Sequence, residues 1–240
     1  MNAQGTLGWL YDRLGHMTSS GATDAISFLK NGKESLARKK YKVQVVTERI
    51  TGIPRDSFLE RLRIIKWGKE QEVNARLAYE FLTGNDVDNV GFVKHPTIKN
   101  LGASPDGLIL SDGLVEFKCP ESTTHIEYIL DGVVPEEYKP QMLDQILVTN
   151  RDWCDFVSYD PRLDINNRIF IVRYKPTTQE IIEFEKRATE FLHEADDLYD
   201  RLMFGSRKQV EELKEEIKEE IKPQIKQEVK PVNQSTYQGF

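Results

Sequence analysis

Cysteine is scarce in this sequence: only Cys119 and Cys154 occur among 240 residues. Two thiols are too few for the disulfide framework of a small secreted protein, and they cannot supply the four thiolates of an iron–sulfur cluster. Also missing are a signal pattern at the N-terminus and any apolar run of the ~18 residues that a membrane span needs. We therefore expect a cytoplasmic protein with no membrane partner.

An excess of positive charge is lacking as well. The chain has 33 Lys and Arg against 39 Asp and Glu, a net charge of −6. This balance is not that of a protein whose whole surface binds nucleic acid. It leaves room for a locally basic channel beside a carboxylate-rich metal site. With 39% hydrophobic residues in 240, the chain is long enough for one substantial domain.

The most distinctive segment of the chain reads SPDGLILSDGLVEFK. Two apolar runs joined by Ser-Asp-Gly predict a β-hairpin whose glycine takes a positive φ in the turn. We expect Leu110 to pair with Leu114. That register places Asp106 opposite Lys118 and diagonal to Glu116.

Asp106, Glu116 and Lys118 would then share one face at the end of apolar strands. Charges in such surroundings are costly unless they are compensated. A hard divalent cation suits carboxylate oxygens, and Lys118 would lie where a metal-bound water meets a phosphate. The alternative is an ordinary hairpin with a Glu116–Lys118 ion pair.

A helix predicted over residues 62–82 offers a third acid. Helical spacing places Glu72 on one stripe with Ala75, Tyr79 and Leu82. A carboxylate on a buried stripe needs a partner, which makes Glu72 a candidate for the metal site. An i,i+4 ion pair with Arg76 is the alternative.

A later helix, predicted to begin at Pro135, carries two glutamines on one face. Gln141 and Gln145 lie there with Tyr138 and Val148. Their amides could hydrogen-bond a water or a phosphate. The alternative is that both are exposed to solvent.

The N-terminal part contains a candidate anion site. Residues Thr18–Ser20 precede an apolar-periodic segment at 22–29, so one of them is expected to cap a helix there. A helix N-terminus attracts anions, and Arg13 beside it would complete a phosphate pocket. The alternative is a capping serine and a surface arginine. The basic segment 30–49 indicates either a solvated helix or contact with a polyanion.

Strand and helix patterns interleave along the rest of the chain. Further strands are expected at 90–95, 153–159 and 168–174, with helices at 121–131 and from Thr177, where Thr177 and Glu180 form a capping box. The sequence therefore predicts an α/β protein with a central mixed sheet flanked by helices.

The C-terminal part differs in composition from the rest. From residue 206 onward, blocks of Glu and Lys leave an apolar stripe only one residue wide. We expect a catalytic domain at 1–205 and a disordered or marginally helical tail at 206–240. A helix that binds a partner or another copy is the alternative for the tail.

Several motifs, taken together, resemble one family. Pro105-Asp106 followed by Glu116-Phe117-Lys118 is similar to the PD-(D/E)XK nuclease signature. The flanking motifs are Trp9-x3-Arg13, Thr18-x-Ser20, Trp67-Gly68-Lys69-x2-Glu72, Tyr138-x2-Gln141 and Ser158-Tyr159-Asp160-Pro161. From about Trp9 to about Leu202 the chain resembles the phage-lambda-type exonucleases, also called YqaJ-like viral recombinases.

The resemblance implies a restriction-endonuclease-like core and a Mg²⁺-dependent 5′→3′ exonuclease, with Mn²⁺ able to substitute and two ions in each site. Such a hydrolase degrades one strand of linear double-stranded DNA and leaves a 3′ overhang for a single-strand annealing partner in recombination. It also implies a homotrimeric ring in a bacterial or phage-infected host cell. In such a ring only the central channel need be basic.

The resemblance also implies roles for individual residues. Asp106, Glu116 and the Phe117 carbonyl would bind metal, and Glu72 would hold or orient the shell of the second ion. Lys118 would position the attacking water and help to deprotonate it, supported by Gln141.

By the same likeness, Arg13, Ser20 and Ser104 would bind the 5′-terminal phosphate, for which an Arg fork and hydroxyls are suited. One position departs from the family pattern: Leu143 stands where a second glutamine is expected, and no role is assigned to Gln145. An endonuclease on the same fold and a non-catalytic DNA-binding module are the competing functions.

Overall fold

The computed structural model describes residues 2–54, 58–205, 209 and 211–217, and it leaves the side chains of residues 58–70 undescribed. The chain divides into two compact units, Met1–Ala195 and Asp196–Phe240. The first unit contains both sheets and every candidate site residue. Within the described residues, no helix is long and apolar enough to cross a membrane.

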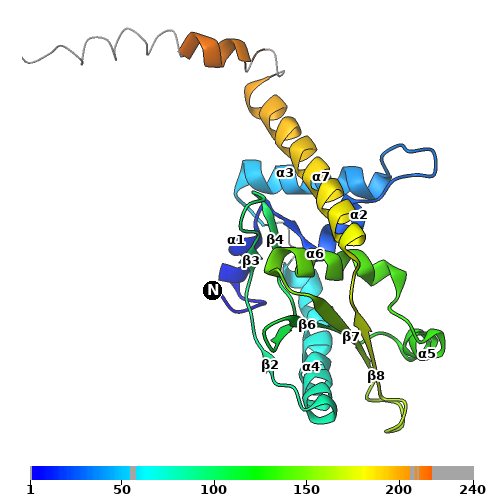
Figure 1. Ribbon diagram of the computed structural model, residues 1–240. Coiled ribbons are helices and arrows are strands. Elements are labelled where there is room, and N and C mark those ends of the chain that lie inside the picture. The colour runs from blue at the N-terminus through cyan, green and yellow to red at the C-terminus, as the bar shows by residue number, and fades with distance from the viewer. Residues whose placement is uncertain (1, 55–57, 206–208, 210, 218–240) are drawn as a thin grey trace, which may run out of the picture. The chain divides into compact units, whose positions relative to one another are not determined.

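A five-stranded mixed sheet forms the centre of the first unit, in the order β2-β5-β6-β7-β8 (Figure 1). Its strands are β2 (Val87–Asp88), β5 (Gly107–Ile109), β6 (Gly113–Lys118), β7 (Trp153–Tyr159) and β8 (Ile169–Tyr174). Strands β6 and β7 are parallel, and the other neighbours are antiparallel. A parallel pair requires a crossover, which is supplied by α5 (Ser122–Asp131), the 3₁₀ turn η2 (Glu136–Tyr138) and α6 (Lys139–Thr149).

The two faces of this sheet pack against different helices. Val115 and Phe117 of β6 share a core cluster with Ala75 and Tyr79 of α4 (Phe58–Thr83). Leu114 lies on the opposite face, in a cluster with residues of α6 and α7 (Thr178–Phe204). Because side chains alternate along a strand, Glu116 lies on the α6 face with Leu114. The predicted α/β class with a mixed sheet between helices is confirmed.

A second, three-stranded sheet in the order β1-β4-β3 carries the N-terminal part of the site. Its strands are β1 (Met17–Thr18), β4 (Leu101–Ala103) and β3 (Val93–Lys94). Before and after β1 come α1 (Leu7–Arg13), the 3₁₀ turn η1 (Ser19–Gly21), α2 (Ala22–Ala25) and α3 (Leu36–Thr51). Because β1 pairs in parallel with β4, the Thr18–Gly21 segment lies beside the residues that follow Ala103.

The predicted cap of a helix over 22–29 is wrong. Helix α2 ends at Ala25, and its N-cap is Gly21, with no side-chain hydrogen bond. Phe28 instead pairs with Glu34 across a short loop, which stops the helix early. A helix of one turn is too short to act as an anion site, so the hydroxyl groups of Thr18–Ser20 must serve another purpose.

The predicted hairpin forms, but its register differs by two residues. Leu108 pairs with Leu114 and Ile109 with Gly113, so Leu110 lies in the turn rather than in a strand. Leu110, not a glycine, takes the positive φ of 50° there. Gly113 is needed for space, because a Cβ at this position would lie 2.1 Å from Cζ2 of Trp153. A shift of two residues keeps every side chain on its face.

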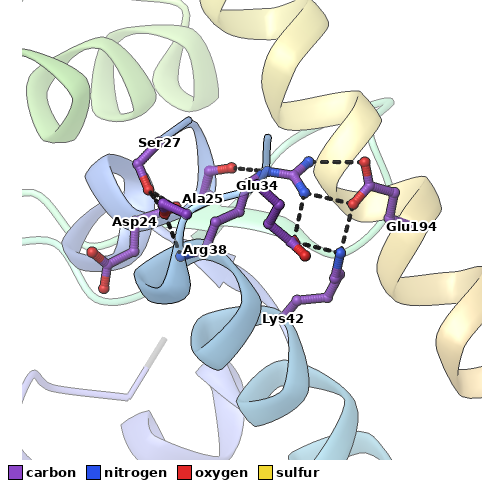
Figure 2. Close-up of polar contacts among 8 residues, drawn as sticks. Asp24, Ala25, Ser27, Glu34, Arg38, Lys42 and Glu194 are labelled. Carbon is purple, nitrogen blue, oxygen red and sulfur yellow. Dashed lines mark hydrogen bonds and ion pairs between the residues drawn. The ribbon is translucent and has the colours of Figure 1, made fainter. Parts of the chain in front are cut away.

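The basic segment 30–49 is neither a freely solvated helix nor wholly available to a polyanion. Arg38 is 1% exposed, and its guanidinium bonds Glu34, Glu194 and the Ala25 carbonyl (Figure 2). Lys42 pairs with the same two glutamates at 2.6 and 2.7 Å. This network fixes α3 against α7, so these two charges are used within the fold.

Other predicted elements are confirmed. The helices over 62–82 and 121–131 and the strands at 153–159 and 168–174 are present as α4, α5, β7 and β8. Thr177 and Glu180 make the capping box at the start of α7, with main-chain to side-chain bonds of 2.8 and 3.2 Å. Leu82, expected on the buried stripe of α4, is 58% exposed.

The second unit is described only in part. Residue 209 and residues 211–217 are helical, and the rest of the predicted tail lies outside the described residues. Leu213 and Ile217, two members of its narrow apolar stripe, are exposed. The boundary after residue 205 stays a prediction.

Candidate active site

The main chain of β6 holds Asp106 beside Glu116. Asp106 comes directly before β5, and its Oδ2 accepts a hydrogen bond of 2.7 Å from the Phe117 amide. That bond crosses the hairpin and fixes the carboxylate next to the residue that follows Glu116. The ring of Phe117 faces the other way, edge-on to Tyr79 of α4. The packing of Phe117 against α4 thus helps to fix Asp106 and Glu116 beside each other near the end of β6.

Glu116 is the most constrained side chain of the site, at 2% exposure. Its Oε1 accepts from Lys118 Nζ at 2.5 Å and also from Gln141 Nε2. Its Oε2 accepts from Gln145 Nε2 at 2.6 Å. Gln141 and Gln145 are one helical turn apart on α6, so both reach the same carboxylate.

The acids outweigh the bases at this end of the sheet. Burial, then the charges of Glu116 and Glu72, raise the pKa of Asp106 well above its usual value. Burial alone would lower the pKa of Lys118, but Glu116 and Asp106 together outweigh it and raise that pKa. One ammonium is thus shared by several carboxylates, and a further cation would stabilise all of them in the ionised form.

The donor set fits a hard divalent cation. Asp106 and Glu116 offer oxygen atoms, the ligand type that Mg²⁺ prefers. Within the described ranges no three Asp, Glu, His or Cys side chains are grouped closely enough to hold a metal by themselves. A cation bound to the carboxylate pair would complete its coordination with main-chain carbonyl, water or substrate oxygens.

Glu72 lies on α4, half-buried, close enough for its charge to raise the pKa of Asp106. Arg76, the alternative partner for Glu72, has its Nε bonded to Glu80 at 3.0 Å. Glu72 and Asp106 both line a cavity of about 890 Å³ that also touches Gln4 and Leu77. This cavity is large enough to admit a nucleotide beside the acids.

A second cluster gathers hydroxyl groups around Arg13. The guanidinium lies 3.1 Å from Ser20 Oγ and 3.4 Å from both Ser104 Oγ and Thr18 Oγ1. It also stacks 4.2 Å above the ring of Trp9, whose indole nitrogen donates to Ser104 at 3.0 Å. The structure therefore brings together all three residues predicted for a phosphate pocket.

The two clusters are neighbours along the chain. Ser104 belongs to the Arg13 cluster, and Asp106 follows two residues later. Three consecutive Cα atoms span at most roughly 7 Å, so the main chain that carries Ser104 and Asp106 keeps their Cα atoms within about that distance. Gln4 fixes the link, because its amide donates to the Pro105 carbonyl at 2.7 Å.

Sequence reasoning assigned no role to several of these contacts. Gln145 was placed on the same face as Gln141, but only the structure shows that both reach Glu116. Trp9 and Thr18 belong to the quoted motifs, and they prove to line the Arg13 cluster. Trp67, Gly68 and Lys69 lie in α4, in the part of that helix whose side chains the structure does not describe.

The fold and the site define a nuclease of the PD-(D/E)XK class. Residues 8–152 match the family model of the YqaJ-like viral recombinase domain. A comparison with curated proteins gives no match. Nucleases of this family depend on divalent metal ions.

Solved structures agree with that match. An alkaline exonuclease from Laribacter hongkongensis, LHK-Exo, is 38% identical, with 82% of this chain and 96% of that chain covered and a TM-score of 0.73. Its complex with dAMP gives the same identity and coverage and a TM-score of 0.74. A phage-related exonuclease from Haemophilus somnus, 14% identical over 78% of this chain and 95% of its own, has a TM-score of 0.55 and shows the fold alone. This chain belongs to the YqaJ-like viral recombinases, the family of phage-lambda-type exonucleases.

Proposed function

We propose that this nuclease is a Mg²⁺-dependent 5′→3′ exonuclease that degrades one strand of linear double-stranded DNA and leaves a 3′ overhang. The observation that carries the proposal is the short chain link between the Arg13 cluster and the acids. Ser104 and Asp106 are two residues apart, so their Cα atoms are separated by at most roughly 7 Å. This distance is of the order of the separation of neighbouring phosphates in one DNA strand. A terminal phosphate held at Arg13 would thus place the next phosphodiester near Asp106 and Glu116.

Each side chain then has a task that its contacts support. Arg13, Ser20 and Ser104 bind the terminal 5′-phosphate, because a guanidinium and hydroxyls supply several donors to one anion. Asp106 and Glu116, with the Phe117 carbonyl, hold the metal, and Glu72 orients the second ion's shell. A bound pair of divalent ions lowers the pKa of water and stabilises the charge that develops on the phosphate.

The remaining polar residues act around Glu116. Lys118 lies between Glu116 and Gln141 Oε1, 3.4 Å from the latter, and over the ring of Tyr138. From there it positions the attacking water, and it takes part in the deprotonation once bound metal ions offset the acids that raise its pKa. Gln141 and Gln145 hold Glu116 in one orientation by bonding its two oxygens separately.

The proposal extends to the surroundings of the enzyme. Mg²⁺ is the physiological ion, Mn²⁺ substitutes for it, and two ions occupy each site. A homotrimer encloses the duplex, and a single-strand annealing protein receives the 3′ overhang. An acidic chain with a net charge of −6 binds DNA in this arrangement because only the channel need be positive.

Digestion of end-labelled duplexes tests the direction of cleavage. With Mg²⁺, a 5′ label is released early and a 3′ label late, and EDTA stops both. A nick-free circle remains intact beside the linear duplex. A cut circle would favour the endonuclease on the same fold, and bound but undigested DNA would favour a non-catalytic module.

A further inference from the structure

The Thr18–Gly21 segment is hydrogen-bonded to the buried carboxyl of Asp144. Ser19 donates a 2.7 Å hydrogen bond to Oδ2 of Asp144. Asp144 is fully buried on α6, and its Oδ1 has no hydrogen-bond partner among the described residues. Burial raises the pKa of Asp144 to about 8, although Ser19 and Arg13 oppose the rise. A buried acid at this position needs a reason, because leaving a polar oxygen unpaired costs free energy.

A tyrosine holds the same segment from α3. The Thr18 amide donates to the hydroxyl of Tyr41 at 2.9 Å, and both groups are buried. Gly21 lies directly on the ring, since a Cβ there would be 2.1 Å from Cζ of Tyr41. The ring of Tyr41 stacks on Phe191 of α7 at 5.3 Å. Tyr41 therefore fixes the main chain of the segment at Thr18 and at Gly21, and Asp144 fixes the side chain of Ser19 between them.

The helix that carries Tyr41 is itself anchored. Arg38, one turn before Tyr41, donates to Glu34 at 2.9 Å and to Glu194 at 2.5 and 3.1 Å. Figure 2 shows its guanidinium between these two glutamates. The helix that carries Asp144 also carries Gln141 and Gln145, which bond Glu116. Helix α6 thus connects the acids to the segment that holds the hydroxyls.

We propose that Asp144 and Tyr41 are positioning residues, which hold the Thr18–Gly21 segment so that Thr18, Ser20 and Arg13 receive the terminal phosphate. This inference rests on the proposed function of the Arg13 cluster. Ser19 faces inward to Asp144, while Thr18 Oγ1 and Ser20 Oγ lie 3.3 Å apart beside Arg13. If either anchor is lost, the hydroxyls lose their fixed separation from the guanidinium.

The test compares kcat/KM on matched duplexes that carry a 5′-phosphate or a 5′-hydroxyl. We expect Tyr41→Phe, which removes only the acceptor of the Thr18 amide, to reduce the advantage of the phosphorylated end roughly tenfold, as for one lost buried hydrogen bond. Asp144→Ala, which removes the acceptor of Ser19, should do the same. Asp144→Asn keeps an acceptor for Ser19 and should retain most of the advantage.

Two controls separate the possible failures. Val43→Ala changes an exposed residue of α3 and should leave the ratio as in the wild type. Arg13→Ala tests the phosphate pocket itself: an unchanged ratio there would reject the proposed function of the cluster. If Arg13→Ala removes the preference while Tyr41→Phe keeps it, or if Tyr41→Phe slows both substrates equally, the positioning role is rejected. Because Tyr41→Phe removes a single oxygen, it decides the question even if Asp144→Ala does not fold.

Discussion

Glu116 brings together side chains from two elements. Its two carboxylate oxygens accept from Lys118 of its own strand and from Gln141 and Gln145 of α6. Asp106 accepts from the main-chain amide of Phe117, and burial, followed by the charge of Glu116, raises its pKa. The two acids therefore have different surroundings: three side chains donate to Glu116, whereas burial and neighbouring negative charge act on Asp106.

Removing the charge of Asp106 tests that difference. Asp106→Asn should lower kcat on linear duplex DNA by roughly three orders of magnitude, the upper range for loss of a group that stabilises transition-state charge. DNA binding should persist, because the Arg13 cluster is untouched. Single-turnover cleavage and a separate binding titration measure the two effects. Digestion at the wild-type rate would show that Asp106 is not a metal ligand.

Asp144 makes the stability of the protein depend on pH. Its folded-state pKa of about 8 lies above the usual 3.8, so the native state keeps a proton that the unfolded chain loses. Stability from this group is therefore full below about pH 4 and decreases as the pH rises towards 8. Three groups from other elements act on this carboxyl: the charge of Arg13 on α1, the hydroxyl of Ser19 on η1 and the titratable hydroxyl of Tyr41 on α3.

Asp144→Asn should remove that dependence. The free energy of unfolding of the wild type should decrease between pH 5 and pH 8.5, and that of the variant should not decrease in the same way. The difference, variant minus wild type, should therefore increase by at least ~1.4 kcal/mol, the value of one pKa unit. Urea unfolding at the two pH values measures the shift. Parallel changes in both proteins would mean that Asp144 titrates normally.

Among single residues, contacts between residues close in sequence could be predicted, whereas contacts between residues far apart in sequence could not. Asp106, Glu116 and Lys118 lie within one hairpin, so their meeting follows from strand alternation, even with the register wrong by two. The bond from Gln145 to Glu116 depends on how α6 sits on the sheet, which no spacing within the helix reveals. The basic segment 30–49 gives no sign that Arg38 is paired within the fold, because its partner Glu194 lies 156 residues away.

At the scale of elements, patterns with strong local signals were predicted well. The capping box at Thr177 and the short runs rich in apolar residues at 153–159 and 168–174 indicated α7, β7 and β8 from residues close in sequence. The expected helix over 22–29 ends at Ala25, and Phe28 pairs with Glu34 across the loop that follows, a contact that helical spacing does not reveal. The expected hairpin register was wrong because the turn comprises residues 110–112 rather than 111–113: Leu110 takes the positive φ of 50°, and Gly113 pairs with Ile109.

The stability of the contact between α3 and α7 should depend on Arg38. Arg38→Met removes a guanidinium whose side chain is 2% exposed and leaves Lys42 to pair with Glu34 and Glu194. We expect a loss of about 2–3 kcal/mol in the free energy of unfolding, somewhat below the range for breaking a fully buried pair. Arg187→Ala, which breaks the exposed pair with Glu183 on α7, is the matched control and should cost less than ~0.5 kcal/mol. Equal losses would show that the Arg38 network adds nothing beyond a surface pair.

Helix α6 should also affect the affinity for metal. Gln145→Met keeps the volume but removes the amide that bonds Oε2 of Glu116. We expect the Mg²⁺ concentration for half-maximal cleavage to rise roughly tenfold, as when a group that orients a metal ligand is lost. A Mg²⁺ titration of the initial rate measures it. An unchanged midpoint would assign Gln145 to packing alone.

For the whole molecule, the main expectation is a closed ring. Sedimentation equilibrium of the full chain should give a mass three times the 27.8 kDa of one protomer. A ring would let an acidic protein enclose DNA, since field lines are set by the channel lining rather than by net charge. A monomer at all concentrations would require DNA to bind on an open surface.

The most direct test of the account is the preference for the chemical state of the 5′ end. A linear duplex labelled at the 5′ end, with and without its terminal phosphate, is digested with Mg²⁺ by the wild type and by Arg13→Ala. We predict faster cleavage of the phosphorylated end by the wild type, release of the 5′ label first, and loss of that preference in the variant. Cleavage that starts from the 3′ end, or a preference that survives Arg13→Ala, would contradict it.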